Sequence, residues 1–285
     1  MMSKDLNGVE AWSRLQSDWL ATRTFDLTIG DEVKTMPYGE VISYYQNPDR
    51  DVRKSANSVV YTKLGNDDIV WSSALRSICD DHIRMCSLRK YSDPMEPSLE
   101  DNDVDKETIN ALMEAIDEGK SFYRRYLKTK AKLLGLNKLG NWDLMAPLPG
   151  SGNIKYSWED SKREVFEAYS SFDKEFGEYI EDMFSRNHID GEVRMGKTSG
   201  AFCSFWYGGK SAYVLQSFNG QLSDIYTQAH ELGHAVHAYL GQRAQKPLNF
   251  NPGSCIAECG SIFGELLLTK SLLEKAKSPE EKRAV

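Results

Sequence analysis

The chain has 285 residues, of which 40% are hydrophobic, 11% aromatic and 27% charged, a composition typical of a soluble globular protein with a buried core. Its net charge of −7 leaves no broad basic face for a phosphate backbone, so we expect no nucleic-acid partner. No apolar run approaches the roughly 20 residues that a membrane span needs, and the start of the chain lacks the apolar centre of a signal peptide, which predicts a cytoplasmic protein without a membrane partner.

Most of the sequence has the periodicity of amphipathic helices, with apolar positions recurring every three or four residues. This pattern predicts helices over 9–22, 51–63, 68–90, 105–118, 120–134 and 158–186. Turn and cap residues at Asn47-Pro48-Asp49 begin the second of these helices. The predicted fold class is therefore mainly α.

A loop rich in Pro and Gly, APLPGSGN at 146–153, precedes the long helix predicted from Trp158. Such a loop is a plausible hinge or domain boundary. We therefore expect a helical region over 1–145 and a second region over 146–285.

The sequence pattern changes after about residue 191, where glycine turns flank two short β-type runs over 201–206 and 212–218. These runs predict a small sheet among the helices. Ser223 and Asp224 follow the sheet and can cap a helix running from Ile225 to about Leu240. A further helix is expected to begin near Ser254, after an Asn-Pro-Gly turn.

The cysteines form an odd set without a C-x-x-C pair, which argues against both a disulfide framework and a thiolate zinc site. We expect most of them to be reduced and packed as small hydrophobic residues. They are Cys79, Cys86, Cys203, Cys255 and Cys259. The last two stand four residues apart on a predicted helix, where sharing a metal ion is a weaker alternative.

The helix predicted from Ile225 contains the H-E-x-x-H pattern as His230-Glu231-Leu232-Gly233-His234. A spacing of four places both imidazoles on one face of a helix, one turn apart, where they can hold one zinc ion. Glu231 is rotated to the side of this pair, towards a water at the metal. The alternative is a surface helix with incidental histidines, but His237 falls in the same short window.

A catalytic zinc ion needs a third protein ligand and an open position. A third His six residues after the second is excluded, because Leu240 stands there. The remaining common solution is a Glu from a following helix, and Glu258 fits, since a lone carboxylate on an otherwise apolar helix is costly without a metal. A salt-bridged structural Glu is the alternative.

Other residues near this pattern have two interpretations. Glu265, on the face of Glu258, is either an acceptor for a ligand imidazole or an ordinary surface acid. His237 is either close to the metal or a packed structural residue. Tyr207 and Tyr213 are either oxyanion donors or packing residues of the sheet. Lys197 is expected to be a solvated turn residue.

Several segments together resemble the oligoendopeptidase F branch of the thimet oligopeptidase family, in the order expected for it. The resemblance covers most of residues 50–270, and the three segments after residue 195 are the most specific. The segments are DPMEPSLEDNDVDKETINALM at 93–113, NWDLMAPL at 141–148, GKTSGAFCS at 196–204, YVLQSFNGQLSDIYTQAHELGHAVH at 213–237 and IAECGSIFGELLL at 256–268.

The resemblance implies a mainly α, two-lobed zinc peptidase with a small β-sheet beside the active-site helix and a channel for short unfolded peptides. It implies one zinc ion on His230, His234 and Glu258, with Glu231 as the catalytic base. It also implies that the strand Gly200-Ala201-Phe202-Cys203 binds the substrate main chain by β-augmentation. Members of the family extend further at both ends, and their C-terminal part carries oxyanion-binding His and Tyr residues, so we expect this chain to be an internal or truncated fragment.

The sequence therefore predicts a zinc-dependent endopeptidase acting on short peptides, in which 146–285 is the catalytic region and a zinc-activated water is deprotonated by Glu231. One alternative is a catalytically impaired, zinc-stabilised fragment that binds peptides or needs a complementing C-terminal chain. A second alternative is a structural helical protein without a metal, which requires every one of these matches to be accidental.

Overall fold

The computed structural model describes residues 8–149, 155–209 and 211–285 and divides the chain into two compact units. The first unit comprises Met1–Ala146 and Met195–Thr198, and the second unit comprises Pro147–Arg194 and Ser199–Val285. Part of the loop 146–153 and the first seven residues lie outside the described residues. Among the helices that are described, none is long and apolar enough to cross a bilayer.

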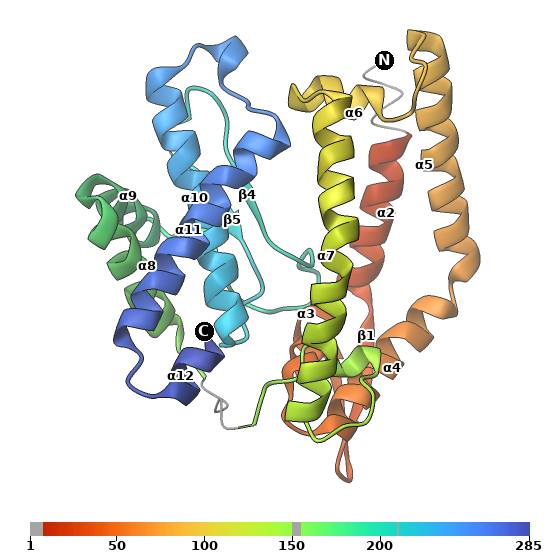
Figure 1. Cartoon of the computed structure of the whole chain (residues 1–285), viewed down its shortest axis with the longest axis vertical. Coiled ribbons are helices and arrows are strands. Elements are labelled where there is room, and N and C mark those ends of the chain that lie inside the picture. Colours follow the sequence, from red (N-terminus) through yellow and green to blue (C-terminus); the bar gives the residue numbers. More distant parts are fainter. Residues whose placement is uncertain (1–7, 150–154, 210) are drawn as a thin grey trace. The chain divides into compact units, whose positions relative to one another are not determined.

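The first unit is helical apart from one β-hairpin (Figure 1). In chain order its elements are α2 (Val9–Thr22), β1 (Thr24–Ile29), β2 (Glu32–Pro37), α3 (Tyr38–Val41), η1 (Ile42–Gln46), α4 (Arg50–Gly65), α5 (Asp68–Arg89), α6 (Glu96–Asn102), α7 (Lys106–Leu133) and η2 (Asn141–Asp143). The predicted helices over 9–22, 51–63 and 68–90 are confirmed as α2, α4 and α5.

The hairpin β1–β2 supplies buried side chains to the core of the first unit. The strands pair antiparallel, and Phe25 and Leu27 of β1 are both fully buried against α4. Gly30 makes the turn with φ +61, a value that favours glycine. The helical region expected over 1–145 therefore also contains a hairpin that was not predicted.

Two predicted helix boundaries are wrong. The segments 105–118 and 120–134 form one continuous helix, α7. Gly119 lies inside it, facing open space, and a single glycine is tolerated in a helix at a modest cost. The segment 158–186 is two helices, because Asp173 is extended, with φ −148 and ψ 132, and its side chain accepts the Glu175 N–H to begin a new helix.

The second unit packs a small sheet and four longer helices around one core (Figure 1). Its elements are α8 (Trp158–Phe172), α9 (Lys174–Ser185), β3 (Ile189–Asp190), β4 (Phe202–Ser204), β5 (Tyr213–Leu215), α10 (Leu222–Ala244), η3 (Pro247–Asn249), α11 (Ser254–Lys275) and α12 (Pro279–Ala284). The strand order is β3-β5-β4, with β3 parallel and β4 antiparallel to β5. A mainly α fold with a small sheet beside α10 is confirmed.

The start of α10 differs in detail from the predicted cap. The carboxylate of Asp224 accepts hydrogen bonds from the backbone N–H groups of Asn219 and Gln221, at 2.7 and 2.9 Å. Asp224 therefore stabilises the N-terminus of the helix as expected. Both Ser223 and Asp224 lie inside the first turn, after the N-cap residue Gln221, because α10 begins at Leu222, three residues before the predicted start at Ile225.

Candidate metal centre

Helices α10 and α11 lie against each other and carry the predicted metal ligands (Figure 1). His230 and His234 stand one turn apart on α10, with ring centroids 5.0 Å apart, and Glu258 stands in the second turn of α11. The structure brings the three side chains together, so that one ligand atom from each lies within 4.8 Å of the others.

The spacing of these atoms matches a tetrahedral zinc site. Glu258 Oε2 lies 3.3 Å from His230 Nε2 and 3.6 Å from His234 Nε2. Zinc bonds of about 2.0–2.1 Å in a tetrahedral arrangement place two ligand atoms roughly 3.3 Å apart. Two imidazole nitrogens and one carboxylate oxygen are also a donor set that zinc accepts, so these residues fit the ion.

Glu258 is not buried, so the expectation of a costly lone carboxylate in an apolar setting is wrong. Its side chain is 49% exposed, and neighbouring Ile256 and Ile262 are also exposed. The buried hydroxyl of Ser261 donates to Glu258 Oε2 at 2.7 Å. This hydrogen bond lowers the pKa of Glu258 against the opposing effect of burial, with further lowering from His234 and His230.

Glu265 lies where it can orient one ligand. Its Oε1 accepts a hydrogen bond from His230 Nδ1 at 2.7 Å, because a carboxylate can only accept. The other ring nitrogen, Nε2, is then the one directed at Glu258. A carboxylate that holds the far nitrogen of a ligand imidazole is a common feature of metal sites.

Glu231 lies beside the ligand atoms in a largely buried position, with 7% of its surface exposed. Burial raises its pKa, His230 lowers it, and the carboxylate of Glu258 raises it again. A hollow of about 320 Å³ adjoins it, lined by Ala201, Tyr226, Thr227, His230, Glu231 and Glu265. The predicted base and one predicted ligand therefore face the same cavity.

The segment predicted to bind substrate lies at the same cavity. Gly200, with φ +86, leads into Ala201 on the cavity wall, and Phe202 and Cys203 form the edge strand β4. Burial and the charge of Glu231 raise the pKa of Cys203 to about 12. Cys203 therefore stays a neutral thiol and is neither a nucleophile nor a thiolate ligand.

Three other candidates make packing contacts, although the two tyrosines among them are exposed. His237 lies against Gly260 of α11, on the α10–α11 interface. The ring of Tyr207 packs edge-on against Phe250 at 5.6 Å, and the ring of Tyr213 stacks on Trp206 at 5.9 Å. These contacts favour the packing interpretation for both tyrosines.

Two predictions about single residues are wrong. Lys197 is buried, with 9% of its surface exposed, because its turn is part of the first unit, where the Gly196 N–H donates to the Ala21 carbonyl at 2.9 Å. Most of the cysteines are not packed in a core, since Cys79, Cys255 and Cys259 are exposed. Those three positions are on the outer faces of α5 and α11.

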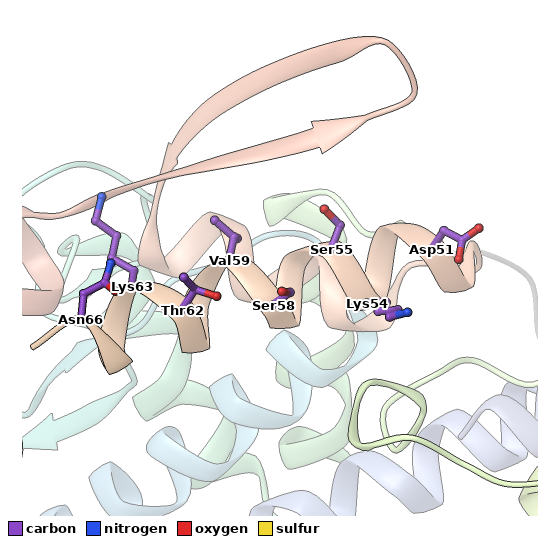
Figure 2. A pocket seen from close by; sticks show the side chains of 8 residues that line it. All are labelled: Asp51, Lys54, Ser55, Ser58, Val59, Thr62, Lys63 and Asn66. Atoms are coloured by element: carbon purple, nitrogen blue, oxygen red, sulfur yellow. The ribbon is translucent and has the colours of Figure 1, made fainter. Parts of the chain in front are cut away.

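A second hollow, of about 630 Å³, runs along the surface of α4 in the first unit (Figure 2). Lys63 points towards the β1–β2 hairpin, where its Nζ donates to the Thr24 carbonyl at 2.5 Å. The lining residues are Asp51, Lys54, Ser55, Ser58, Val59, Thr62, Lys63 and Asn66. They form a solvated helix face rather than a convergent set of catalytic groups.

Sequence reasoning missed Ser261 and Tyr169. Ser261 stands three residues after Glu258, a spacing that places two side chains together on a helix and was visible in the sequence. Tyr169 of α8 donates its hydroxyl hydrogen bond to the Ala229 carbonyl at 2.6 Å. Sixty residues separate these two, and no local pattern indicates the contact.

Together the fold and the site define a mainly helical protein with an H-E-x-x-H helix and, on the next helix, a Glu whose carboxylate lies beside both histidines. The family model described as Peptidase family M3 matches residues 43–285. The chain belongs to Peptidase family M3, which confirms the resemblance seen in its sequence.

Curated relatives of the chain are considerably longer than it is. The oligoendopeptidase F homolog of Lactococcus lactis subsp. lactis is 28% identical over 255 residues, which make up 90% of this chain and 42% of that protein. Oligopeptidase PepF of Bacillus subtilis is 24% identical over 249 residues, covering 87% of this chain and 37% of that protein. The chain thus spans less than half the length of these relatives.

Solved structures share the fold. A putative oligoendopeptidase F from Bacillus anthracis has a TM-score of 0.82 at 19% identity, over 96% of this chain and 51% of that one. A structure described as PZ peptidase A with an inhibitor also has a TM-score of 0.82, at 18% identity, over 93% of this chain and 47% of that one.

Proposed function

We propose that this chain carries the zinc site and the general base of a cytoplasmic endopeptidase that hydrolyses internal bonds of short unfolded peptides. The observation that carries the proposal is the convergence of three ligand atoms at zinc-like spacing, with Glu231 beside them. Membership of Peptidase family M3 supports the reaction class. The names of the relatives, which are oligopeptidases, support short peptides as substrates.

His230, His234 and Glu258 would hold the metal, and Glu265 would orient His230. A zinc ion bound there would supply Lewis acidity, which polarises a carbonyl and lowers the pKa of water to about 7. A set of three protein ligands is that of a catalytic rather than a structural zinc site.

Glu231 is the proposed general base and acid. Its largely buried carboxylate removes a proton from the attacking water and then delivers that proton to the leaving amine. The raised pKa of Glu231 suits this task, because a base works best when its pKa approaches the working pH. Proton transfer of this kind typically contributes 10²–10⁴-fold to the rate.

Strand β4 is the proposed seat of the substrate main chain. It lies at the edge of its sheet, and Ala201, directly before it, lines the cavity shared by His230 and Glu231. An extended peptide that pairs with such an edge is held by backbone hydrogen bonds and needs little side-chain recognition. This arrangement suits an enzyme that accepts many short sequences.

A second candidate function is that of a zinc-stabilised part that acts only together with further polypeptide. The outer face of α11 favours this alternative, because Ile256, Ile262 and Leu266 are 51–61% exposed. Exposed apolar patches of this kind often mark an interface. A complementing chain, equivalent to the remaining part of the relatives, would cover this face.

Cleavage of a quenched fluorescent peptide of about ten residues tests the proposal, with residues 1–285 as the enzyme and Glu231→Gln as the matched variant. We expect both proteins to bind one zinc ion and only the parent to cleave. Bound zinc without turnover in the parent would favour the second function. A parent that binds no zinc would contradict both.

A further inference from the structure

The hydroxyl of Tyr169 lies at the point where α8, α10 and α11 meet. The side chain is 1% exposed and donates to the Ala229 carbonyl at 2.6 Å. Ala229 directly precedes His230, so the acceptor belongs to the turn of α10 that carries the first proposed metal ligand. Burial, reinforced by the charge of Glu265, raises the pKa of this phenol, which remains a neutral donor.

Helix α11 leaves room for the Tyr169 hydroxyl because the residue opposite it is Gly264. A Cβ placed on Gly264 would lie 1.9 Å from the Tyr169 oxygen and 2.5 Å from the Ala229 oxygen. Gly264 directly precedes Glu265, whose carboxylate accepts from His230 Nδ1 at 2.7 Å. The Tyr169 hydroxyl thus lies against the backbone of Ala229 and of Gly264. Each of these residues directly precedes one partner of the His230–Glu265 hydrogen bond.

We propose that Tyr169 is a positioning residue for the metal site. Its hydroxyl fixes the separation of α10 and α11 so that Glu265 holds the His230 imidazole with Nε2 directed at the ion. This inference rests on the proposed zinc site. Groups that orient a metal ligand typically change metal affinity 10–100-fold when removed.

The variant Tyr169→Phe tests this role, since it removes one oxygen and keeps the packed ring. Zinc affinity, measured by competition with a chromogenic chelator, is expected to fall about tenfold while the helical circular dichroism is unchanged. The matched control is Tyr239→Phe on α10, whose exposed hydroxyl donates to Glu175 at 3.4 Å and accepts from Arg243 at 3.2 Å. Its zinc affinity is expected to change less than about twofold.

A double-mutant cycle separates positioning from general packing. If Tyr169 acts through Glu265, then Tyr169→Phe has little further effect on zinc affinity in a Glu265→Gln background. Independent losses that multiply would overturn the positioning role.

Gly264→Ala is the second variant, for use if Tyr169→Phe does not fold. It presses a Cβ onto the hydroxyl and is expected to weaken zinc binding in the same way. Parent-like zinc affinity in the folded variants would overturn this inference alone. A parent chain that binds no zinc would overturn the proposed function itself.

Discussion

Gly233 of α10 and Gly260 of α11 are in direct backbone contact. A Cβ on Gly233 would lie 2.4 Å from the Gly260 carbonyl oxygen and 2.7 Å from the Ser261 Cα. Gly233 immediately precedes His234, so this close approach of the two helices lies beside a proposed metal ligand. Small residues at this crossing bring His234 and Glu258 close enough to hold the proposed ion.

We therefore expect Gly233→Ala to weaken both stability and zinc binding. The new methyl group meets backbone atoms, which cannot rotate away, and overpacking of this kind costs about 1–3 kcal/mol. Gly241→Ala in the same helix is the matched control, because its Cβ would meet only Phe250 at an ordinary 3.6 Å. Its higher helix propensity should leave stability equal or raised by up to about 1 kcal/mol. Urea unfolding measures the stability of both variants. Equal changes in stability would contradict the close backbone contact of Gly233.

Ser261→Ala should weaken zinc binding most at low pH. Removing the 2.7 Å hydrogen bond raises the pKa of Glu258 towards its ordinary value, so protons compete with zinc over a wider acidic range. We expect little loss at pH 7.5 and a loss that grows as the pH falls through the ordinary carboxyl value of 4.5. The control Ser171→Ala removes a hydroxyl that donates only to the Ala168 carbonyl. A loss independent of pH would refute this account.

Local patterns in the sequence predicted the parts of the fold that depend on local chemistry. The spacing of His230 and His234 is a property of one helix, so the sequence suffices to place both imidazoles on one face. The break at Asp173 had a visible signal, since Asp is a favoured N-cap residue and acidic residues such as Glu175 are enriched in the first turn of a helix. The hairpin was also readable, from alternation around Phe25 and Leu27 and the Gly30 turn.

Contacts between distant segments could not be read in this way. The burial of Lys197 depends on where its turn docks, and the exposure of Glu258 depends on which face of α11 is covered. The position of the Tyr169 hydroxyl depends on Gly264 opposite it. Helical periodicity fixes which residues share a face but not which partner that face meets.

Zinc should stabilise the second unit in a way that depends on His234. At a free zinc concentration of 100 times Kd, binding adds about 2.7 kcal/mol to the free energy of unfolding. Burial lowers the pKa of His234, so protons compete with zinc there less than at an ordinary imidazole, and the effect should persist at pH 6.5. Thermal unfolding with zinc or a chelator measures it.

His234→Ala should abolish the zinc-dependent shift in unfolding temperature. His82→Ala, in α5 of the first unit, should retain the shift. The His82 ring bonds to the Pro94 carbonyl and to Cys86 and is not one of the proposed ligands. A zinc effect that survives in the His234 variant would place the ion elsewhere.

The first unit should lose stability in acid through Asp143. Burial alone would raise the pKa of this fully buried carboxylate, but hydrogen bonds from Arg50, the Gly140 N–H and Arg53 outweigh it and lower the pKa to about 2. Because the folded pKa lies below the unfolded value of 3.8, the stabilisation is complete above about pH 4 and is lost as the pH falls towards 2. The shift corresponds to about 2 kcal/mol.

Asp143→Asn should lower the free energy of unfolding by about 3–5 kcal/mol at neutral pH, because it leaves the buried guanidinium of Arg53 without a counter-charge. Asp117→Asn is the control, since that carboxylate is 65% exposed and pairs with Lys120 one turn away, a contact worth less than about 0.5 kcal/mol. Urea unfolding from pH 2 to 7 distinguishes them. If the parent chain and the Asp143 variant lose stability in parallel below pH 4, other carboxylates carry the acid sensitivity.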